Sequence, residues 1–190
     1  MSAPIVLDLE TKHTFQEVGF DHRKLGISMV GIYDYGRNVF EAYFENDLNK
    51  LFPLLESASL IIGFNIRKFD FPVLAPYYVG QIDNLPLLDL LEDVEKAMGF
   101  RLALDVLAKE TLGAQKNGHG LLAIEYYRTG NLEKLKEYCL SDVRITRDLY
   151  EWGKKQGKVY FKDAKGRREI PVQWNKIGLS QSNIPLTLPL

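Results

Sequence analysis

The chain has 190 residues, of which 46% are hydrophobic and 26% charged, and its formal net charge at pH 7 is −1. This composition is that of an ordinary globular protein, and the length suits one domain with a sizeable core. A nucleic-acid ligand cannot be inferred from the overall charge, so any attraction to phosphate must be local or come through metal ions.

The cysteine count and the N-terminus indicate the compartment. Cys139 is the only cysteine, which excludes an internal disulfide and a cysteine-rich zinc site. The N-terminus lacks the basic and apolar regions of a signal peptide, and no apolar run approaches the roughly 20 residues that span a bilayer. We therefore expect a cytoplasmic protein with no membrane partner.

The first predicted element is a strand that carries two acids. Ile5-Val6-Leu7-Asp8-Leu9-Glu10-Thr11 begins as a branched apolar run, which is typical of a buried strand. Side chains alternate along a strand, so Asp8 and Glu10 project from the same face about 7 Å apart. Two ionised acids there are costly without a compensating positive charge, and they indicate a metal ion.

The next part of the chain predicts an α/β sheet. A polar connection at 12–24 is followed by an antiparallel meander, a helix whose N-cap is Asp47 and which Pro53 limits to its later part, and a short buried strand parallel to the first. The meander strands are expected at 26–35 and 39–44, the helix at 48–58 and the parallel strand at 60–64.

The later elements are mainly helical. The segment 72–78 predicts a short helix, and 85–91 predicts either a strand or the start of a helix. Helices are expected at 102–112 and 131–152, with Asn131 as an N-cap and Gly113 and Gly153 as stops. The segment 117–120 is expected to be a mobile loop.

The C-terminal part is expected to extend the same domain. Residues 159–174 predict a hairpin that turns at Asp163-Ala164-Lys165-Gly166, and residues 175–190 have no regular pattern. We therefore divide the chain into a domain at 1–155 and a hairpin and tail at 156–190.

Asp70 is an acid with two interpretations. It lies in Gly63-Phe64-Asn65-Ile66-Arg67-Lys68-Phe69-Asp70-Phe71-Pro72, just beyond the predicted parallel strand. It suits the N-cap of a short helix, because aspartate commonly precedes a helix that begins with proline. It also suits a functional carboxylate, because α/β sheets bind ligands at the carboxyl ends of their parallel strands.

Tyr138 and Asp142 interrupt an apolar helical stripe. Residues 135, 138, 142, 145 and 149 recur at helical spacing and read Leu, Tyr, Asp, Ile and Leu. Asp142 therefore faces the protein body, with Tyr138 one turn earlier on the same face. An ion pair with a buried Arg or Lys is the structural alternative.

For several other polar residues, structural roles or solvated side chains are the better interpretation. Asp89 and Asp105 also interrupt apolar runs, and capping or structural hydrogen bonding is the better interpretation for both. The three histidines share no metal-ligand spacing and lie in polar segments, which favours solvated side chains, although the position of one between glycines could let it reach a substrate. These histidines are His13, His22 and, between the glycines, His119.

Together these acids resemble a known nuclease superfamily. The pattern Asp8-x-Glu10, then Asn65 to Asp70, then Tyr138-x-x-x-Asp142 resembles the three motifs of the DEDD 3′→5′ exonucleases, in their tyrosine subgroup. The segment 63–72 is similar to the second motif of proofreading exonuclease domains in family B DNA polymerases. Two departures are Phe64 in place of tyrosine and Lys68 in place of a second asparagine.

The resemblance implies a fold and a metal site. It implies a ribonuclease H-like α/β fold of three layers, with a mixed central sheet and helices on both faces. It also implies two Mg²⁺ or Mn²⁺ ions. Asp8 would bridge both ions, Glu10 and Asp142 would complete one, and Asp70 would act on the other through water. Tyr138 would orient the attacking water, since its ordinary pKa near 10 makes it a poor base.

The resemblance also suggests substrate contacts and a partner. Candidates for holding the 3′-terminal nucleotides are Thr11, Asn65, Lys68 and Phe69, the last by stacking on a base or as part of the core. Arg67 adds local positive charge. For a second group of basic residues, at 154–168, a solvated charged surface is the better interpretation. The tail at Leu186–Leu190 is similar to peptides that dock on bacterial sliding clamps, although packing on its own domain is the alternative.

The function expected from the sequence is metal-dependent 3′→5′ exonuclease activity that releases nucleoside 5′-monophosphates from single-stranded DNA, in repair or replication. The same chemistry on RNA is the alternative, because nothing in the sequence distinguishes the 2′-hydroxyl. A nucleic-acid-binding module without catalysis is the alternative of another class, and the presence of all four acids and the tyrosine speaks against it.

Overall fold

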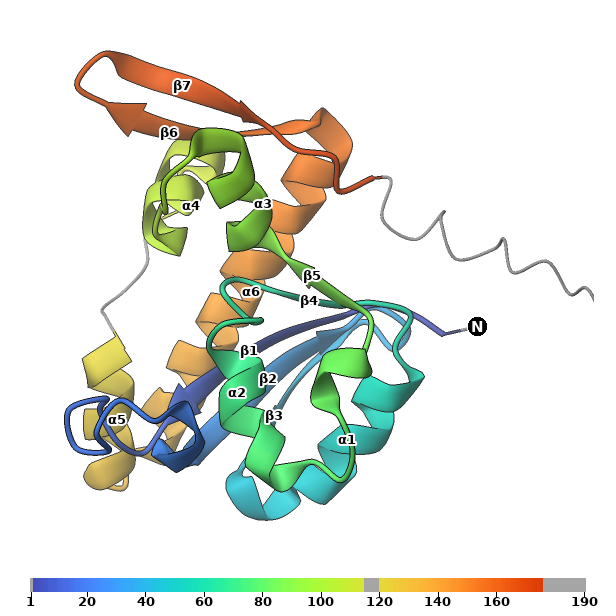
Figure 1. The fold of residues 1–190 in the computed structure, drawn as a ribbon, viewed down its shortest axis with the longest axis vertical. Helices are drawn as coiled ribbons and strands as arrows, with labels where there is room; N and C mark the ends of the chain where they lie inside the picture. Colours follow the sequence, from blue (N-terminus) through green and yellow to red (C-terminus); the bar gives the residue numbers. More distant parts are fainter. Residues whose placement is uncertain (1, 115–119, 176–190) are drawn as a thin grey trace, which may run out of the picture.

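The structure is a computed structural model that describes residues 2–114 and 120–175 (Figure 1). Three sequence-based expectations fall outside these residues. They concern His119, most of the predicted loop at 117–120, and the tail at 186–190.

A mixed five-stranded sheet forms the centre of the molecule, in the order β3-β2-β1-β4-β5 (Figure 1). β2 and β3 pair antiparallel, as do β1 and β2, whereas β4 runs parallel to both β1 and β5. This confirms the predicted meander and parallel strand. The strands are β1 (Ile5–Thr11), β2 (Ile27–Asp34), β3 (Val39–Tyr43), β4 (Ile61–Gly63) and β5 (Leu87–Asp89).

Some of the helices connect the strands of the sheet, and others come after the last of these strands in the chain. The α-helices are α1 (Leu48–Ser57), α2 (Asp70–Leu74), α3 (Leu90–Met98), α4 (Leu104–Leu112), α5 (Gly120–Arg128) and α6 (Leu132–Gln156). Short 3-10 turns are η1 (His22–Lys24), η2 (Glu45–Asp47), η3 (Ala75–Tyr77) and η4 (Ile82–Asn84). Across 2–114 and 120–175, no helix combines the length and the apolar character needed to cross a membrane.

The two faces of the sheet bury different sets of side chains. Ile5, Leu7 and Leu9 of β1 belong to a core cluster with residues of α1 and α2. Val6 points the other way and belongs to a cluster with residues of α3, α4 and α6. Because side chains alternate along β1, Asp8 and Glu10 share the face of Val6. The fold therefore directs both acids toward α6.

α6 is longer than the sequence predicted. The helix continues through Gly153 and ends at Gln156, where Gly157 adopts a left-handed conformation (φ +69°) and caps it. The predicted stop at Gly153 is therefore wrong. A Cβ atom on Gly153 would lie 2.2 Å from the ring of Trp174, so this glycine permits close packing rather than ending a helix. Asn131 does cap the helix, as predicted, by accepting from the Lys134 amide.

Of two expectations for α1, the one for Pro53 was wrong, whereas Asp47 occupies the predicted N-cap position without the expected hydrogen bond. Pro53 lies inside the helix without confining it to its later part, because regular helix already begins at Leu48. Asp47 precedes the helix but makes no capping hydrogen bond with its side chain, which instead pairs with Lys50 Nζ at 2.6 Å.

The segment 85–91 contains both predicted alternatives, the strand β5 followed by the start of α3. The hairpin is confirmed as β6 (Lys158–Asp163) and β7 (Gly166–Pro171), which pair antiparallel. Its inner side chains, Val159, Phe161 and Ile170, join the core cluster on the α6 side of the sheet.

Candidate active site

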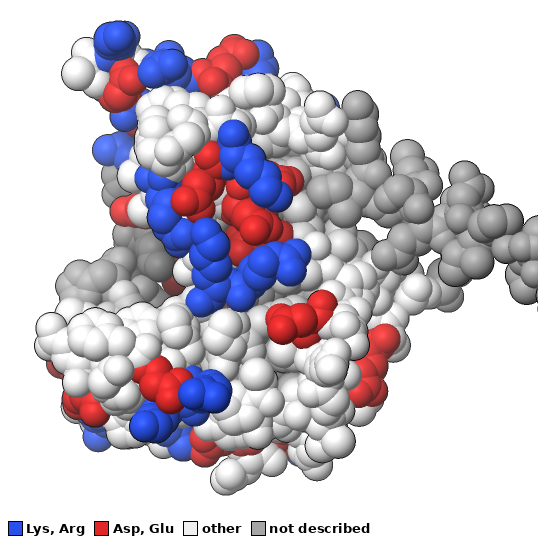
Figure 2. All heavy atoms as spheres, viewed as in Figure 1, with Lys and Arg blue, Asp and Glu red and all other residues white. Residues whose placement is uncertain are grey.

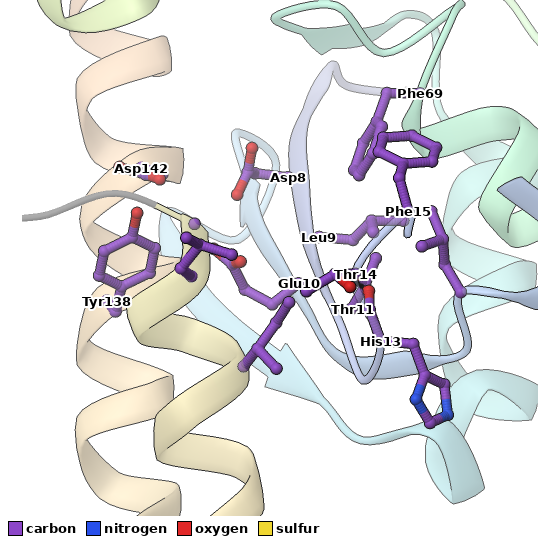
Figure 3. Close-up of a pocket in the computed structure, with 14 residues that line it drawn as sticks. Asp8, Leu9, Glu10, Thr11, His13, Thr14, Phe15, Phe69, Tyr138 and Asp142 are labelled. Carbon is purple, nitrogen blue, oxygen red and sulfur yellow. Dashed lines mark hydrogen bonds between the residues drawn. The ribbon is translucent and has the colours of Figure 1, made fainter. Parts of the chain in front are cut away.

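The two acids of β1 form the base of the candidate site. Glu10 is buried and Asp8 is half-buried, and Figure 3 shows both side chains on the side of the strand that faces α6. Carboxylate oxygens of Asp8 and Glu10 and the sulfur of Cys139 lie within 4.8 Å of one another. The strand therefore brings a buried and a half-buried acid together beside the helix.

Gly31 allows α6 to come this close. It lies on β2 directly opposite Asp8. A Cβ atom at Gly31 would lie 2.8 Å from Cys139 Sγ and 2.9 Å from Val143 Cγ2. A larger residue would therefore push the helix away from β1. This glycine within a strand was a sequence signal for the close approach, and no prediction was based on it.

Tyr138 and Asp142 complete the cluster from α6. Both are buried, at 8% and 4% exposure. They lie four residues apart on one face of the helix, and Figure 3 shows the tyrosine hydroxyl directed toward the same space as Asp142 and Asp8. Burial and the carboxylates of Asp8, Glu10 and Asp142 all raise the pKa of the Cys139 thiol. Three acids therefore converge at this point of the helix.

Asp70 lies at the start of α2, beside β1. It is 3% exposed, and its Oδ1 accepts a hydrogen bond of 3.1 Å from the backbone amide of Leu9, which lies between the two acids of β1. Burial raises the pKa of Asp70 to about 8, against the hydrogen bonds that favour its charged form. Asp70 is thus joined to β1 through the backbone and does not line the cavity at the site.

Asp89 has the structural role that the sequence predicted. It caps α3 by accepting from the amides of Leu91 and Glu92. It also accepts from the amides of Asn65 and Arg67, at 2.9 and 3.0 Å. One side chain therefore fixes the turn before α2 to the start of α3. Asp105, by comparison, is exposed and accepts from the adjacent amide of Val106.

The remaining candidates for substrate contact separate into two groups. Thr11 and Phe69 line the cavity, whereas Asn65 and Lys68 do not. Asn65 adopts a left-handed conformation (φ +66°), and its side-chain oxygen accepts from Arg101 Nη2 at 2.6 Å. Lys68 is exposed and lies 3.4 Å from Glu95. Their predicted substrate contacts remain predictions.

A cavity of about 380 Å³ opens above the acids (Figure 3). Its walls are largely apolar and include Phe15, Phe69 and, from α5, Leu121 and Ile124. Phe15 and Phe69 pack edge to face at 5.8 Å. The cavity therefore has acids at its base and apolar surfaces around it, which is an arrangement typical of ligand sites.

Several of these residues were missed in the sequence. Phe15, Thr14 and the exposed His13 come from the segment 12–24, which predicted only a polar connection. Leu121 and Ile124 come from α5, to which no predicted element was assigned; its apolar residues were the available signal. The expectation of a solvated His22 was wrong, because its ring packs against Phe15 at 4.8 Å.

Comparison with known proteins gives the family. Residues 5–153 match the sequence profile of the RNase_H superfamily. The chain belongs to the RNase H superfamily. The matched range contains β1, the turn before α2 and the face of α6 that carries Tyr138 and Asp142, so every acid of the candidate site lies within this RNase H-like region. The β6-β7 hairpin lies beyond it. Among curated proteins, none matches the sequence significantly.

Solved structures share the RNase H-like fold. A family B DNA polymerase from Pyrobaculum calidifontis matches with a TM-score of 0.61 and 17% identity over 79% of this chain. RNase D from Trypanosoma brucei matches with a TM-score of 0.58 and 19% identity over 80% of this chain. The same RNase D in complex with RNA U12 gives a TM-score of 0.56 and 19% identity, again over 80% of this chain.

This chain spans a part of those proteins. The match covers 24% of the polymerase chain and 57% and 55% of the two RNase D chains. At these identities the likeness shows a shared fold.

The acids suit hard divalent cations. Asp8, Glu10 and Asp142 offer oxygen ligands around Cys139, and oxygen ligands are what Mg²⁺ and Mn²⁺ prefer. The buried Cys139 thiol holds its proton, because its pKa is raised well above its usual value. The donor set therefore fits Mg²⁺ or Mn²⁺.

Proposed function

We propose that the protein is a metal-dependent 3′→5′ exonuclease that acts on single-stranded nucleic acid. The observation that carries the proposal is the convergence of Asp8, Glu10, Asp142 and Tyr138 at the base of one cavity with apolar walls. Membership of the RNase H superfamily, and a fold shared with a DNA polymerase and with RNase D, support nucleic acid as the substrate.

In this proposal Asp8, Glu10 and Asp142 would hold two Mg²⁺ or Mn²⁺ ions, and Asp70, beside β1, would act on one of them through water. Such ions, when bound, supply positive charge to the phosphorus and to the leaving oxygen and make water more acidic. Asp70 is tied to the Leu9 amide, so it also fixes the part of β1 that lies between Asp8 and Glu10. The four acids thereby form one positioned group.

The remaining side chains position the reactants. The Tyr138 hydroxyl orients the attacking water by a hydrogen bond, because a phenol with an ordinary pKa near 10 keeps its proton at neutral pH. Phe15, Phe69 and Leu121 enclose the terminal base and exclude water from around it. Thr11 is held by donating to the His13 carbonyl at 3.0 Å. It therefore contributes a fixed wall beside the sugar.

The DNA substrate follows from the motif resemblance to family B polymerases, and we propose single-stranded DNA as the preferred strand, with release of nucleoside 5′-monophosphates. RNA is the second candidate, favoured by the shared fold with an RNase D that has been crystallised with RNA. Hydrolysis of DNA and hydrolysis of RNA would require the same acids. The same active-site variants therefore test both candidate activities.

The test is hydrolysis of a 3′-labelled oligonucleotide with Mg²⁺ or Mn²⁺. Asp8→Ala and Asp142→Ala should each reduce release of the label to background, because each removes an oxygen ligand from the base of the cavity. Asp105→Ala is the matched control, since Asp105 is exposed and far along the chain from the acids. Full activity in either of the two active-site variants would contradict the proposed roles of these residues.

A further inference from the structure

Beyond the cavity, an exposed aromatic residue lies close to basic side chains. Phe100, in the loop between α3 and α4, is 46% exposed although it is a large apolar residue. Arg101 follows it directly, and both Phe100 and Arg168 of β7 contact the same ring, that of Phe161. An exposed aromatic face flanked by arginines is the usual platform for single-stranded nucleic acid.

A continuous set of contacts leads from the cavity to this platform. Phe69, in the cavity wall, donates its amide to the Asn65 carbonyl at 3.0 Å, so the two residues close one turn. The Asn65 side chain in turn accepts from Arg101 at 2.6 Å. The wall of the cavity and the platform are therefore the two ends of one connected surface.

The second half of this surface belongs to the hairpin. The Phe100 ring meets the edge of Phe161 on β6, with centroids 6.0 Å apart. The Arg168 guanidinium lies 5.5 Å from the centroid of the same Phe161 ring. The hairpin, which lies beyond the residues matched to the family, thereby fixes both the aromatic face and a cation beside it.

The charges along this surface favour phosphate. Lys68 and Arg101 both pair with the single carboxylate of Glu95, at 3.4 and 3.3 Å, so two cations share one acid. These ion pairs are partly exposed, which leaves the cations accessible to a phosphate backbone. Figure 2 shows basic and acidic side chains interleaved on this face of the molecule, where the basic ones surround the acids.

The chemistry of the site predicts which part of the substrate strand would contact this surface. In an in-line displacement, the leaving oxygen departs opposite the attacking water. Tyr138, which orients the water, comes from α6, whereas the turn at 65–69 follows β4 on the other side of β1. With the water on the α6 side, the leaving oxygen and the part of the substrate that remains after cleavage would lie on the side of that turn.

We propose that Lys68, Phe100, Arg101 and Arg168 form a track that binds the single strand upstream of the scissile bond. The Phe100 ring stacks on a base, and the three cations contact successive phosphates. This inference rests on the proposed function, because the track is defined by the direction in which the strand leaves the cavity. It assigns to the hairpin a role in holding long substrates.

The test compares the affinities of a dodecanucleotide and a trinucleotide without divalent ions, so that no cleavage occurs. Fluorescence anisotropy of a labelled dodecanucleotide gives one Kd, and competition by the trinucleotide gives the other. Phe100→Leu keeps an apolar side chain against Phe161 but removes the flat face, and it should raise the Kd of the dodecanucleotide about tenfold. The Kd of the trinucleotide should stay at the wild-type value.

Further variants separate stacking from packing. Phe100→Tyr should restore wild-type affinity, because it retains an aromatic face. Arg168→Ala should raise the Kd of the dodecanucleotide and make that Kd less dependent on salt. Matched controls are Val79→Ala, an exposed apolar residue on another part of the surface, and Lys50→Ala, which is paired with an aspartate as Arg168 is. Both controls should bind as the wild type does.

Two outcomes would overturn the track. One is a Phe100→Leu variant that binds the dodecanucleotide as tightly as the wild type. The other is an equal loss of affinity for both lengths. Because the assay contains no divalent ion, its result stands apart from catalysis. A wild-type protein that binds strands in this pattern but cleaves none would contradict the proposed function and leave the track in place.

Discussion

Tyr138 is the one member of the acidic cluster that carries no charge at neutral pH in its ordinary state. We expect Tyr138→Phe to lower kcat about 100-fold, as loss of one positioned hydrogen bond commonly does, while the Kd for substrate stays unchanged. Single-turnover hydrolysis measures the first quantity and anisotropy the second. Tyr78→Phe removes a hydroxyl that bonds to Glu56 on another part of the surface and should leave both unchanged.

A wild-type rate in Tyr138→Phe would show that the hydroxyl does not orient the water. A parallel loss of binding would instead indicate that the ring contributes to the substrate cavity.

Asp70 should make stability depend on pH in the absence of divalent ions. Its folded pKa is raised to about 8, whereas an unfolded aspartate titrates near 3.9. Between about pH 4 and pH 8 the unfolded chain is therefore ionised at this position while the folded chain keeps a proton. The contribution of Asp70 to the free energy of unfolding falls as the pH rises through this range.

Asp70→Asn should remove that dependence, because asparagine retains an oxygen that can accept from the Leu9 amide. We expect the variant to be more stable than the wild type by a few kcal/mol at pH 8 in EDTA, and to differ little at pH 4. Urea unfolding at the two pH values measures both differences. A stability difference that does not change with pH would contradict the raised pKa.

At the scale of elements, a substitution at Gly153 tests why α6 continues past the predicted stop. A Cβ atom there meets the Trp174 ring at 2.2 Å. Gly153→Ala should therefore lower the free energy of unfolding by about 1–3 kcal/mol, although alanine is the better helix former. Gly120→Ala at the start of α5, where no atom lies within 4 Å of the added Cβ, should show no such loss.

Thermal unfolding of the two variants measures the contrast. If Gly153→Ala were as stable as the wild type, the contact between α6 and Trp174 would not be the reason for the glycine.

The elements show what the sequence could and could not predict. Strong periodicity placed β1, β4, α6 and the hairpin, since each buries a regular stripe of side chains. Gly153 misled the helix prediction because a glycine that accommodates a distant ring looks the same in sequence as one that ends a helix. α5 was missed because its short apolar pattern follows a glycine-rich segment.

The site was predictable to the extent that its residues interrupt local patterns. Asp8, Glu10, Tyr138 and Asp142 stood out as polar groups on apolar faces. Phe15, Leu121 and Arg101 did not, because apolar and charged residues in loops are ordinary. Their relation to the acids depends on tertiary contacts, such as that between Arg101 and Asn65, which join segments far apart in the chain.

At the scale of the whole molecule, the sheet and α6 hold the acids in place and the surrounding segments shape what reaches them. β1 and α6 supply the base of the cavity, while α5 and the segment 12–24 supply its walls. The hairpin lies beyond the RNase H-like region and packs against the same core. This division predicts that hydrolysis depends on β1 and α6. The handling of long strands should depend on the surrounding segments and on the hairpin.

The most direct measurement is a time course of degradation on matched DNA and RNA strands, each labelled at the 5′ end, in Mg²⁺ or Mn²⁺. A 3′→5′ exonuclease produces a ladder of labelled products that shorten one nucleotide at a time, and we predict this ladder with DNA shortening faster than RNA. Asp142→Ala should leave the strands intact. Internal cleavage products, or wild-type protein that degrades neither strand with either ion, would contradict the account.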